Sequence, residues 1–215
     1  MGAYGGGGPA YGGSMSQGGV PGGGVVKLRR QIPSVEVKFY DQQWGMNCGA
    51  NTWTLGSAVP LAGILQGTGP SERVGRKIKV CGIIIRGTCT LPQASPWTVD
   101  VVVDKQCNGV AATAAQVYAN PLDFTSFPNP FEETRFRFLK RFQSFNPAQA
   151  TPVPGGAPVE QAISLAIKTN FTVEYNASTG AVTDLTSDNL MIFNCSPQPM
   201  TNLNRCLIRI LYTDA

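Results

Sequence analysis

Residues 67–91 constrain the fold more than any other stretch, because they contain the longest strand-like run of the chain, RKIKVCGIIIRGTCTL. The apolar side chains of this run fall on both faces of an extended strand: Ile78, Val80 and Ile84 on one, and Cys81, Ile83, Ile85 and Cys89 on the other. Lys77 and Lys79, near its start, are expected to stay in solvent. A strand that is apolar on both faces needs a packing layer on each side. The run therefore predicts, on each side, a packed sheet or a neighbouring subunit.

Several shorter segments also alternate between apolar and polar residues, as strands do. They are VEVKFY at 35–40, WTVDVVVD at 97–104, TRFRFLKRFQSF at 134–145, LAIKTNFTVEY at 165–175, NLMIFNC at 189–195 and RCLIRILYT at 205–213. Residues 44–65 mix Gly, Asn and Pro with short apolar groups, which predicts a long surface connection with one or two brief strands. A turn is expected at Asn108-Gly109, and the stretch ATAAQVYAN behind it predicts one short helix.

About seven or eight strands with almost no helix indicate an all-β domain of the sandwich, Greek-key or jelly-roll type. Residues 1–34 differ in composition, since they hold 12 of the 25 glycines. Such a segment buries too little apolar surface to offset its ordering entropy. We therefore predict a Gly-rich N-terminal arm over residues 1–34, disordered or extended, and one folded domain over residues 35–215.

The composition argues against an enzyme. The chain has no histidine, which removes the Ser-His-Asp and Cys-His nucleophile systems and every His-containing zinc site. Its 13 acidic residues are scattered, so we predict no catalytic site, no metal and no cofactor. The six cysteines have no metal-ligand spacing and are predicted to be free, buried thiols in a reducing compartment. No apolar run is long enough to span a membrane, so no membrane partner is expected.

The motifs, taken in order, resemble a known family. The series VEVKFYD, ILQGTGPSERVGRKIKVCGIIIRG, VVVDKQCNG, TRFRFLKRF and LIRILYTD resembles the capsid proteins of the circovirus-like group of circular single-stranded DNA viruses, the CRESS-DNA viruses. The chain is also similar to the coat proteins of satellite tobacco necrosis-type viruses, through QG…R.G..I, the RFLK strand and the final YTDA. The resemblance covers about residues 35–215.

This resemblance implies a single eight-stranded antiparallel jelly roll of the viral capsid type, with two four-stranded sheets facing each other. About sixty copies would close into a T=1 icosahedral shell through heterologous contacts. The implied strands are residues 35–40 as the first, 76–91 as the second, 97–104 as the third, 135–145 as the fifth and 206–213 as the last. The implied function is a self-assembling capsid protein that encloses circular single-stranded DNA. It would reside in the virion, and in the host nucleus or cytoplasm during assembly; the host receptor is not indicated.

Three groups of basic residues are candidates for nucleic-acid contact. Relatives carry an arginine-rich arm, whereas this arm has only KLRR at its base, so about sixty copies at a net charge of +4 carry roughly 240 positive charges against a few thousand phosphates. The inner surface would therefore have to be locally basic. The candidates are Lys27, Arg29 and Arg30 at the base of the arm, then Arg73, Arg76, Lys77 and Lys79, and then Arg135, Arg137, Lys140 and Arg141. For each group, the alternative is a solvated surface or salt bridges.

The phenylalanines between the last group of arginines, Phe136, Phe138 and Phe142, are expected to pack in the core rather than stack on bases, because they fall on the opposite face of the strand. Two other functions stay open from the sequence. One is the coat protein of a small RNA or satellite virus with the same fold. The other is a non-viral β-sandwich binding module, monomeric or trimeric, with a glycine-rich tether.

Overall fold

The computed structural model describes residues 35–56, 59–91, 95–144, 159–200 and 205–215, which belong to one compact unit, Val35–Ala215. The predicted arm, with Lys27, Arg29 and Arg30, lies outside the described residues. No helix in the described part of the chain is long and apolar enough to cross a membrane.

The described residues form eight strands: β1 (Lys38–Trp44), β2 (Thr54–Leu55), β3 (Lys77–Leu91), β4 (Trp97–Asp104), β5 (Phe136–Ser144), β6 (Val159–Glu174), β7 (Asn189–Cys195) and β8 (Arg205–Asp214). One helical turn, α1 (Ala114–Val117), and two 3-10 turns, η1 (Pro130–Glu132) and η2 (Val182–Asp184), complete the elements. The short helix was predicted at this place, and Gly109 in the preceding turn has φ +76°.

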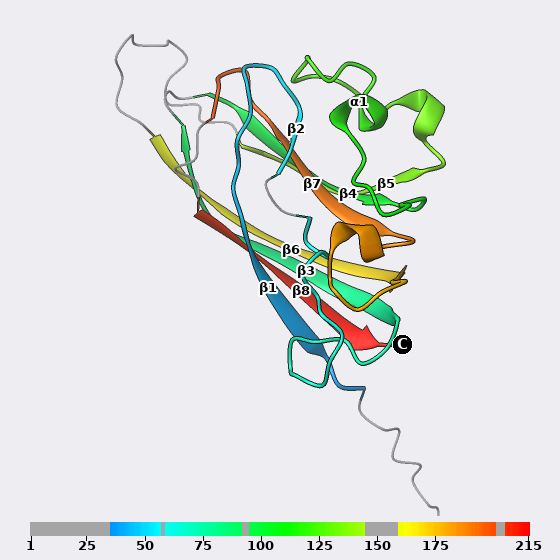
Figure 1. Cartoon of the computed structure of the whole chain (residues 1–215). Helices are drawn as coiled ribbons and strands as arrows, with labels where there is room; N and C mark the ends of the chain where they lie inside the picture. Colours follow the sequence, from blue (N-terminus) through cyan, green and yellow to red (C-terminus); the bar gives the residue numbers. More distant parts are fainter. Residues whose placement is uncertain (1–34, 57–58, 92–94, 145–158, 201–204) are drawn as a thin grey trace, which may run out of the picture. The chain divides into compact units, whose positions relative to one another are not determined.

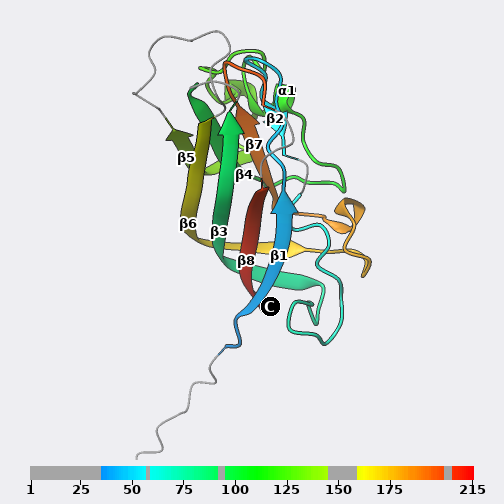
Figure 2. The same ribbon diagram turned by 90° about the vertical axis from the view of Figure 1, so that its left-hand side faces the viewer.

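The strands form two antiparallel sheets that pack face to face, ordered β1-β8-β3-β6 and β2-β7-β4-β5 (Figures 1 and 2). The first strand pairs with the last, the second with the seventh, the third with the sixth and the fourth with the fifth. This nested pairing is that of a jelly roll. The predicted all-β jelly roll is therefore confirmed. The run 76–91 is the third strand and not the second, because the two-residue strand β2 precedes it.

The main core lies between the sheets. It is built from the inward-facing residues of both sheets, for example Val80 and Ile85 of β3, Val101 of β4, and Ile208 of β8. Residues 44–65, predicted as a surface connection, also contribute to it: Trp44, Met46, Leu61 and Ile64 are buried. The brief strand predicted here is present as β2, but the segment is not only a surface connection, and its buried side chains were missed because few of its residues alternate.

The prediction that the middle of β3 is buried on both faces was also wrong, as was its grouping of the apolar residues. Val80 and Gly82 pair with Tyr212 and Leu211, which are consecutive in β8, so Cys81 is an extra residue in a β-bulge, and the pairing with β6 is also irregular at this point. The bulge changes the parity, and Ile78 before it faces the same core as Ile83 and Ile85 after it. On the opposite face Arg86 is exposed. Within the described residues, the outer face of β3 has no second layer.

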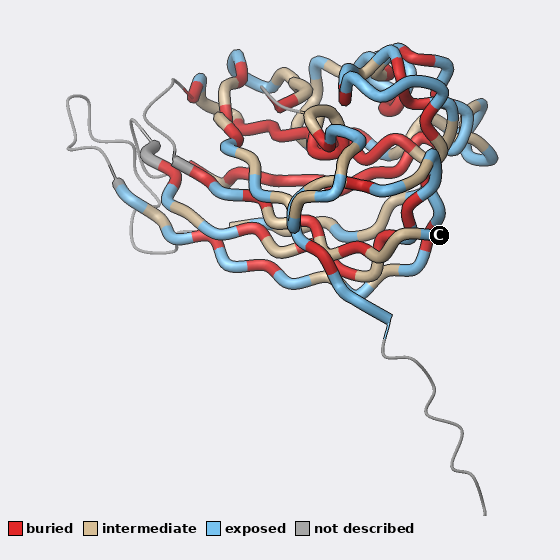
Figure 3. The backbone as a smooth tube through the Cα atoms, turned by 60° about the horizontal axis from the view of Figure 1, so that its bottom comes forward, coloured by how far each residue is buried: buried red, intermediate tan, exposed pale blue. Residues whose placement is uncertain are grey.

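Burial on both faces belongs instead to β4 and β7, in which every residue is buried. Figure 3 shows this as unbroken buried stretches in one sheet, against alternating buried and exposed residues in the other. The reason is the segment between β4 and β5, residues 105–135, which we call the β4–β5 excursion. It folds back over the outer face of the β2-β7-β4-β5 sheet and buries a second apolar cluster there, which includes Trp53, Val102, Tyr118 and Phe193.

Candidate assembly and nucleic-acid surfaces

The outer face of the β1-β8-β3-β6 sheet, here called the sheet face, combines apolar and basic side chains. Strand register places its residues in rows: Gln43, Leu207, Arg86 and Ser164 in one row, and Asp41, Arg209, Ile84 and Ala166 in the next. Phe39 and Leu207 are each 43% exposed although both are large and apolar. The Arg209 guanidinium lies 4.7 Å from the centre of the Phe39 ring. Phe39 pairs with Leu211 and Gln43 with Leu207, so the two exposed apolar side chains lie on one face with the Asp41–Arg209 ion pair between them.

The edge strand β1 contributes to this face in an unexpected way. Its sequence alternates as predicted, but the apolar row of Val35, Val37 and Phe39 points to solvent. Lys38 points inward and is 7% exposed; its Nζ lies 2.9 Å from an Asp214 carboxylate oxygen and donates to the carbonyl of Glu72. A buried lysine is stable only when it is paired and hydrogen-bonded in this way. The fold thus leaves Phe39 of β1, and Val35 and Val37 directly before this strand, uncovered by the described residues.

The sheet face also carries unpaired positive charge. Arg209 is neutralised by Asp41, with which it makes two hydrogen bonds of 2.7 and 2.6 Å, and Lys77 by Glu174 at 2.5 Å. Lys79, Arg86 and Lys168 are exposed and have no carboxylate within ion-pair distance among the described residues. Glu160, at the start of β6, is also exposed and has no cation within ion-pair distance among the described residues. The face is therefore net positive.

The β4–β5 excursion presents the opposite character. Residues 122–133, LDFTSFPNPFEE, contain three carboxylates and no lysine or arginine. Three large apolar side chains in this segment are exposed: Leu122 by 68%, Phe127 by 78% and Phe131 by 94%. We call residues 122–133 the acidic ridge. Its backbone is held by short-range hydrogen bonds, including Asn120 N–H to Ser126 Oγ and Phe131 N–H to Asn129 Oδ1.

Two buried ion pairs fix the excursion and the start of β5 to the sheet. The fully buried Asp100 carboxylate accepts from Nε and Nη2 of Arg141, at 2.8 and 2.6 Å, and from the Tyr118 hydroxyl at 2.9 Å. Tyr118 also stacks on Trp53 with ring centres 4.0 Å apart. Burial, followed by the Asp100 charge, raises the pKa of Tyr118 well above its ordinary value. The hydroxyl therefore stays protonated and remains a donor.

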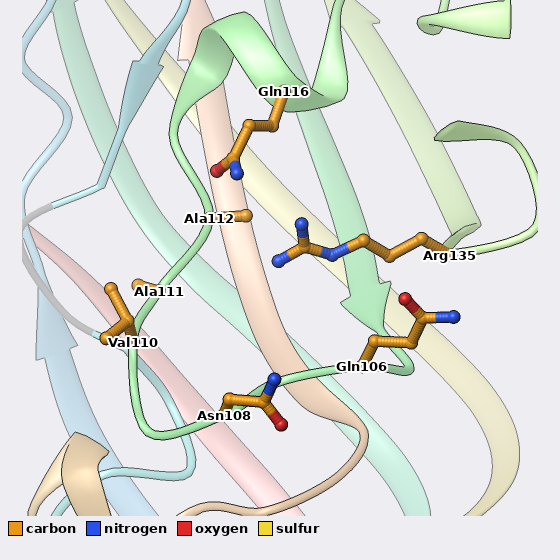
Figure 4. A pocket seen from close by; sticks show the side chains of 7 residues that line it. All are labelled: Gln106, Asn108, Val110, Ala111, Ala112, Gln116 and Arg135. Atoms are coloured by element: carbon orange, nitrogen blue, oxygen red, sulfur yellow. The ribbon is translucent and has the colours of Figure 1, made fainter. Parts of the chain in front are cut away.

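Asp104 and Arg135 form the second pair. The carboxylate of Asp104 is fully buried and accepts from Nε and Nη2 of Arg135 at 2.9 and 2.8 Å. The hydrogen bond to Asp104 raises the pKa of Arg135. Arg135 also lines a small polar pocket of about 210 Å³ together with Gln106, Asn108, Gln116 and the segment Val110–Ala112 (Figure 4). Gln116 is held in place because its Oε1 accepts from the N–H and the hydroxyl of Thr113.

Some of the side chains predicted to contact nucleic acid bind groups within the folded chain, and others are exposed to solvent. Arg73 is fully buried and donates to the carbonyls of Ile64, Gly75 and Ala177, and it lies 4.0 Å from the centre of the Tyr175 ring. Burial lowers the pKa of its guanidinium. Arg135 and Arg141 are taken by the two aspartates. These three arginines therefore serve intramolecular contacts, because each carries a buried acceptor set that a phosphate would have to displace.

Five of the predicted contacts stay exposed, namely Arg76, Lys77, Lys79, Arg137 and Lys140, and of these Lys77 is paired with Glu174. Arg76 and Lys77 lie at the end of the unit where β1 begins, since Val74 N–H donates to Asp214 and Asp214 pairs with Lys38 of β1. The candidates Lys27, Arg29 and Arg30 precede β1 in the sequence. Sequence reasoning missed Arg86, Lys168 and Arg209, because nothing in the sequence shows that β3, β6 and β8 share one face.

The phenylalanines of β5 pack in two different places. Pairing between β4 and β5 shifts between Val101 and Val102, so Leu139 is an extra residue. Phe136 and Phe138 pack in the cluster under the excursion, whereas Phe142 packs between the sheets, 5.2 Å from Trp97. The expectation that all three serve packing is met, but on two faces.

The cysteines are free, as predicted, and all but Cys81 are buried. Burial raises the pKa of Cys89 and Cys195 to about 12 and that of Cys206 to about 11. Thiols of such high pKa are poor nucleophiles and poor metal ligands at neutral pH. In the described part of the chain, no group of three or more His, Cys, Asp or Glu side chains is arranged to hold a metal ion.

Comparison with known proteins finds distant structural similarities. No family model matches the sequence, and no curated protein matches it. A solved chain of Desmodium yellow mottle tymovirus shares 13% identity over 94% of this chain and 95% of that chain, with a TM-score of 0.31. A chain from a structure described as "KBV activated particle at acidic pH" shares 8% identity over 94% of this chain and 80% of that chain, with a TM-score of 0.27. Because these scores are low, the proposals below rest on the strand pairing and the surfaces of this chain.

Proposed function

We propose that this chain is a structural coat protein whose copies assemble into a closed shell around nucleic acid. The observation that carries the proposal is the uncovered sheet face of a jelly roll, where Phe39 and Leu207 are exposed beside unpaired Arg86 and Lys168. Burial of such a surface against a partner lowers the free energy of the complex. The role is structural, without a reaction.

The finer form of the proposal follows the sequence resemblance. About sixty copies form a T=1 icosahedral shell of the circovirus-like type, and heterologous contacts repeat around its symmetry axes. The contents are circular single-stranded DNA. The protein resides in the virion, and in the host nucleus or cytoplasm while the shell forms.

Phosphate contact is assigned to the cations that the fold leaves available. Arg76 is exposed and has no carboxylate within ion-pair distance among the described residues, whereas Lys77 beside it is paired with Glu174. Lys27, Arg29 and Arg30 lie within four positions of one another in the sequence, so they offer local positive charge although the whole chain has a net charge of only +4. Arg137 and Lys140 on β5 are a second, separate basic pair.

Light scattering on the purified full chain tests the shell. We expect a uniform species many times the mass of the 22.8 kDa chain. Only monomers or dimers across salt and pH would contradict the proposal. Digestion of extracted nucleic acid with DNase and with RNase decides between a DNA virus and the coat of a small RNA or satellite virus.

A β-sandwich binding module is the second candidate, and the polar pocket beside Arg135 favours it. Two of its polar groups are held rigid by Asp104 and Thr113, as in a preorganised ligand site. A monomer in light scattering that is retained specifically on a glycan or peptide array would support this module over the shell.

A further inference from the structure

The two surfaces described above are complementary to each other. The sheet face is net positive, with Phe39 exposed on its edge strand β1 and Leu207 exposed on β8, and the acidic ridge carries Asp123, Glu132 and Glu133 around exposed apolar side chains. Potentials of opposite sign across an interface steer association and fix its register. The positive charge of the sheet face is thus complementary to the negative charge of the acidic ridge.

One copy is unable to bring its own two surfaces together. The sheet face points away from the core between the sheets, whereas the excursion that carries the ridge packs on the outer side of the other sheet. Figures 1 and 2 show the excursion, around α1, beyond β4 and β7, with the β1-β8-β3-β6 sheet on the other side of the sandwich. Any contact between ridge and sheet face therefore joins two copies.

Symmetric pairing of like surfaces is disfavoured. Two sheet faces packed together would bring Arg86 and Lys168 of one copy against the same cations of the other. Two ridges would bring carboxylates together in the same way, and like charges juxtaposed in an interface destabilise it. A contact of ridge with sheet face avoids both.

We propose that the acidic ridge of one copy docks on the sheet face of a second copy, so that Phe131 packs beside Leu207, the register partner of Arg86, while Glu132 and Glu133 pair with Arg86 and Lys168. The contact is heterologous, and repeated rotation by such a contact closes a ring or a shell. The inference rests on the proposed shell, for which it names the contact between neighbours.

Charge reversal tests the contact. The variants Glu132→Lys/Glu133→Lys and Arg86→Glu/Lys168→Glu each place like charges across it, and we expect each to reduce the yield of particles about tenfold at low salt. Combining all four substitutions in one chain restores opposite charges at every contact and is expected to restore the yield. The control Lys105→Glu makes the same kind of charge reversal, half as large as in Arg86→Glu/Lys168→Glu, at an exposed residue directly after β4 and away from the sheet face, and should assemble normally.

Each variant is expected to fold, because the substituted residues lie at the surface. Its thermal unfolding curve checks this. Yields that stay at the wild-type level in both double variants, or a fourfold variant that stays defective while folded, would overturn the contact but leave the shell itself standing. A wild-type chain that forms no particles contradicts the shell. In that case a photo-crosslinker at position 131 decides the contact alone: crosslinks to β1 or β8 of another copy support it, and their absence refutes it.

Discussion

At the scale of residues, the same ion pair occurs twice in very different surroundings. Arg141 and Arg209 each make two hydrogen bonds to one aspartate, but Asp100 is fully buried whereas Asp41 is in contact with solvent. Removal of one partner from a buried pair leaves an uncompensated charge. In an exposed pair, water takes the place of the lost partner.

We therefore expect Arg141→Ala to lower the free energy of unfolding by about 3 kcal/mol, because Asp100 keeps only Tyr118 as a donor. The matched variant Arg209→Ala should change it very little. Urea unfolding followed by tryptophan fluorescence measures both. An equal loss of unfolding free energy in the two variants would show that the burial of Asp100 does not make its ion pair more stabilising.

The buried thiols predict a loss of stability at alkaline pH. In the folded chain the pKa of Cys89 and Cys195 is about 12 and that of Cys206 about 11, against an ordinary value of 9.0. Above about pH 9 the unfolded chain releases thiol protons that the folded chain retains, so the free energy of unfolding falls as the pH rises towards 12. Unfolding curves measured between pH 8 and pH 11 check this. Replacing Cys89 and Cys195 by Ala should flatten the dependence.

At the scale of elements, the bulge at Cys81 decides which way β3 faces. Without the extra residue, either Ile78 and Val80 or Ile83 and Ile85 would turn to the outer face. Deletion of Cys81 is therefore expected to abolish the folded state, whereas Cys81→Ala, which keeps the length of the chain, should cost about 1 kcal/mol or less. Circular dichroism and soluble yield distinguish the two. A deletion variant that folds cooperatively would show that the strand tolerates a one-residue slip.

This bulge also shows where sequence reasoning stops. Alternation located most strands, because a half-exposed strand needs one apolar face, and left a sandwich, a Greek key or a jelly roll open; the family resemblance selected the jelly roll. It did not give the faces of β3 and β5, since an extra residue at Cys81 or Leu139 changes the parity without any mark in the sequence. The partners of Arg135 and Arg141 were hidden for a similar reason: Asp104 and Asp100 lie 31 and 41 residues away along the chain. From the sequence alone, Arg135 and Arg141 were therefore candidates for phosphate contact, although each makes an ion pair within the folded chain.

At the scale of the whole molecule, holding copies together and binding nucleic acid are assigned to different surfaces. The acidic ridge and the sheet face carry the contact between copies, whereas the cations assigned to phosphate are Arg76, just before β3, and, before the compact unit in the sequence, Lys27, Arg29 and Arg30. Substitutions in the acidic ridge or the sheet face should therefore leave nucleic-acid binding unchanged, and substitutions of the cations assigned to phosphate should leave assembly unchanged.

The triple variant Lys27→Ala/Arg29→Ala/Arg30→Ala tests the division. We expect it to form particles of wild-type size with less nucleic acid, measured as a lower ratio of absorbance at 260 nm to that at 280 nm. In a titration with single-stranded DNA, each phosphate contact adds about 0.7 to the slope of log affinity against log salt, so three lost cations should reduce the slope by about 2. The single variant Lys140→Ala, which removes one cation of the separate pair on β5, should reduce the slope by about 0.7 at most. A triple variant with unchanged slope and unchanged contents would remove the base of the arm from the nucleic-acid surface, and one that fails to assemble would show that the two properties are not separate.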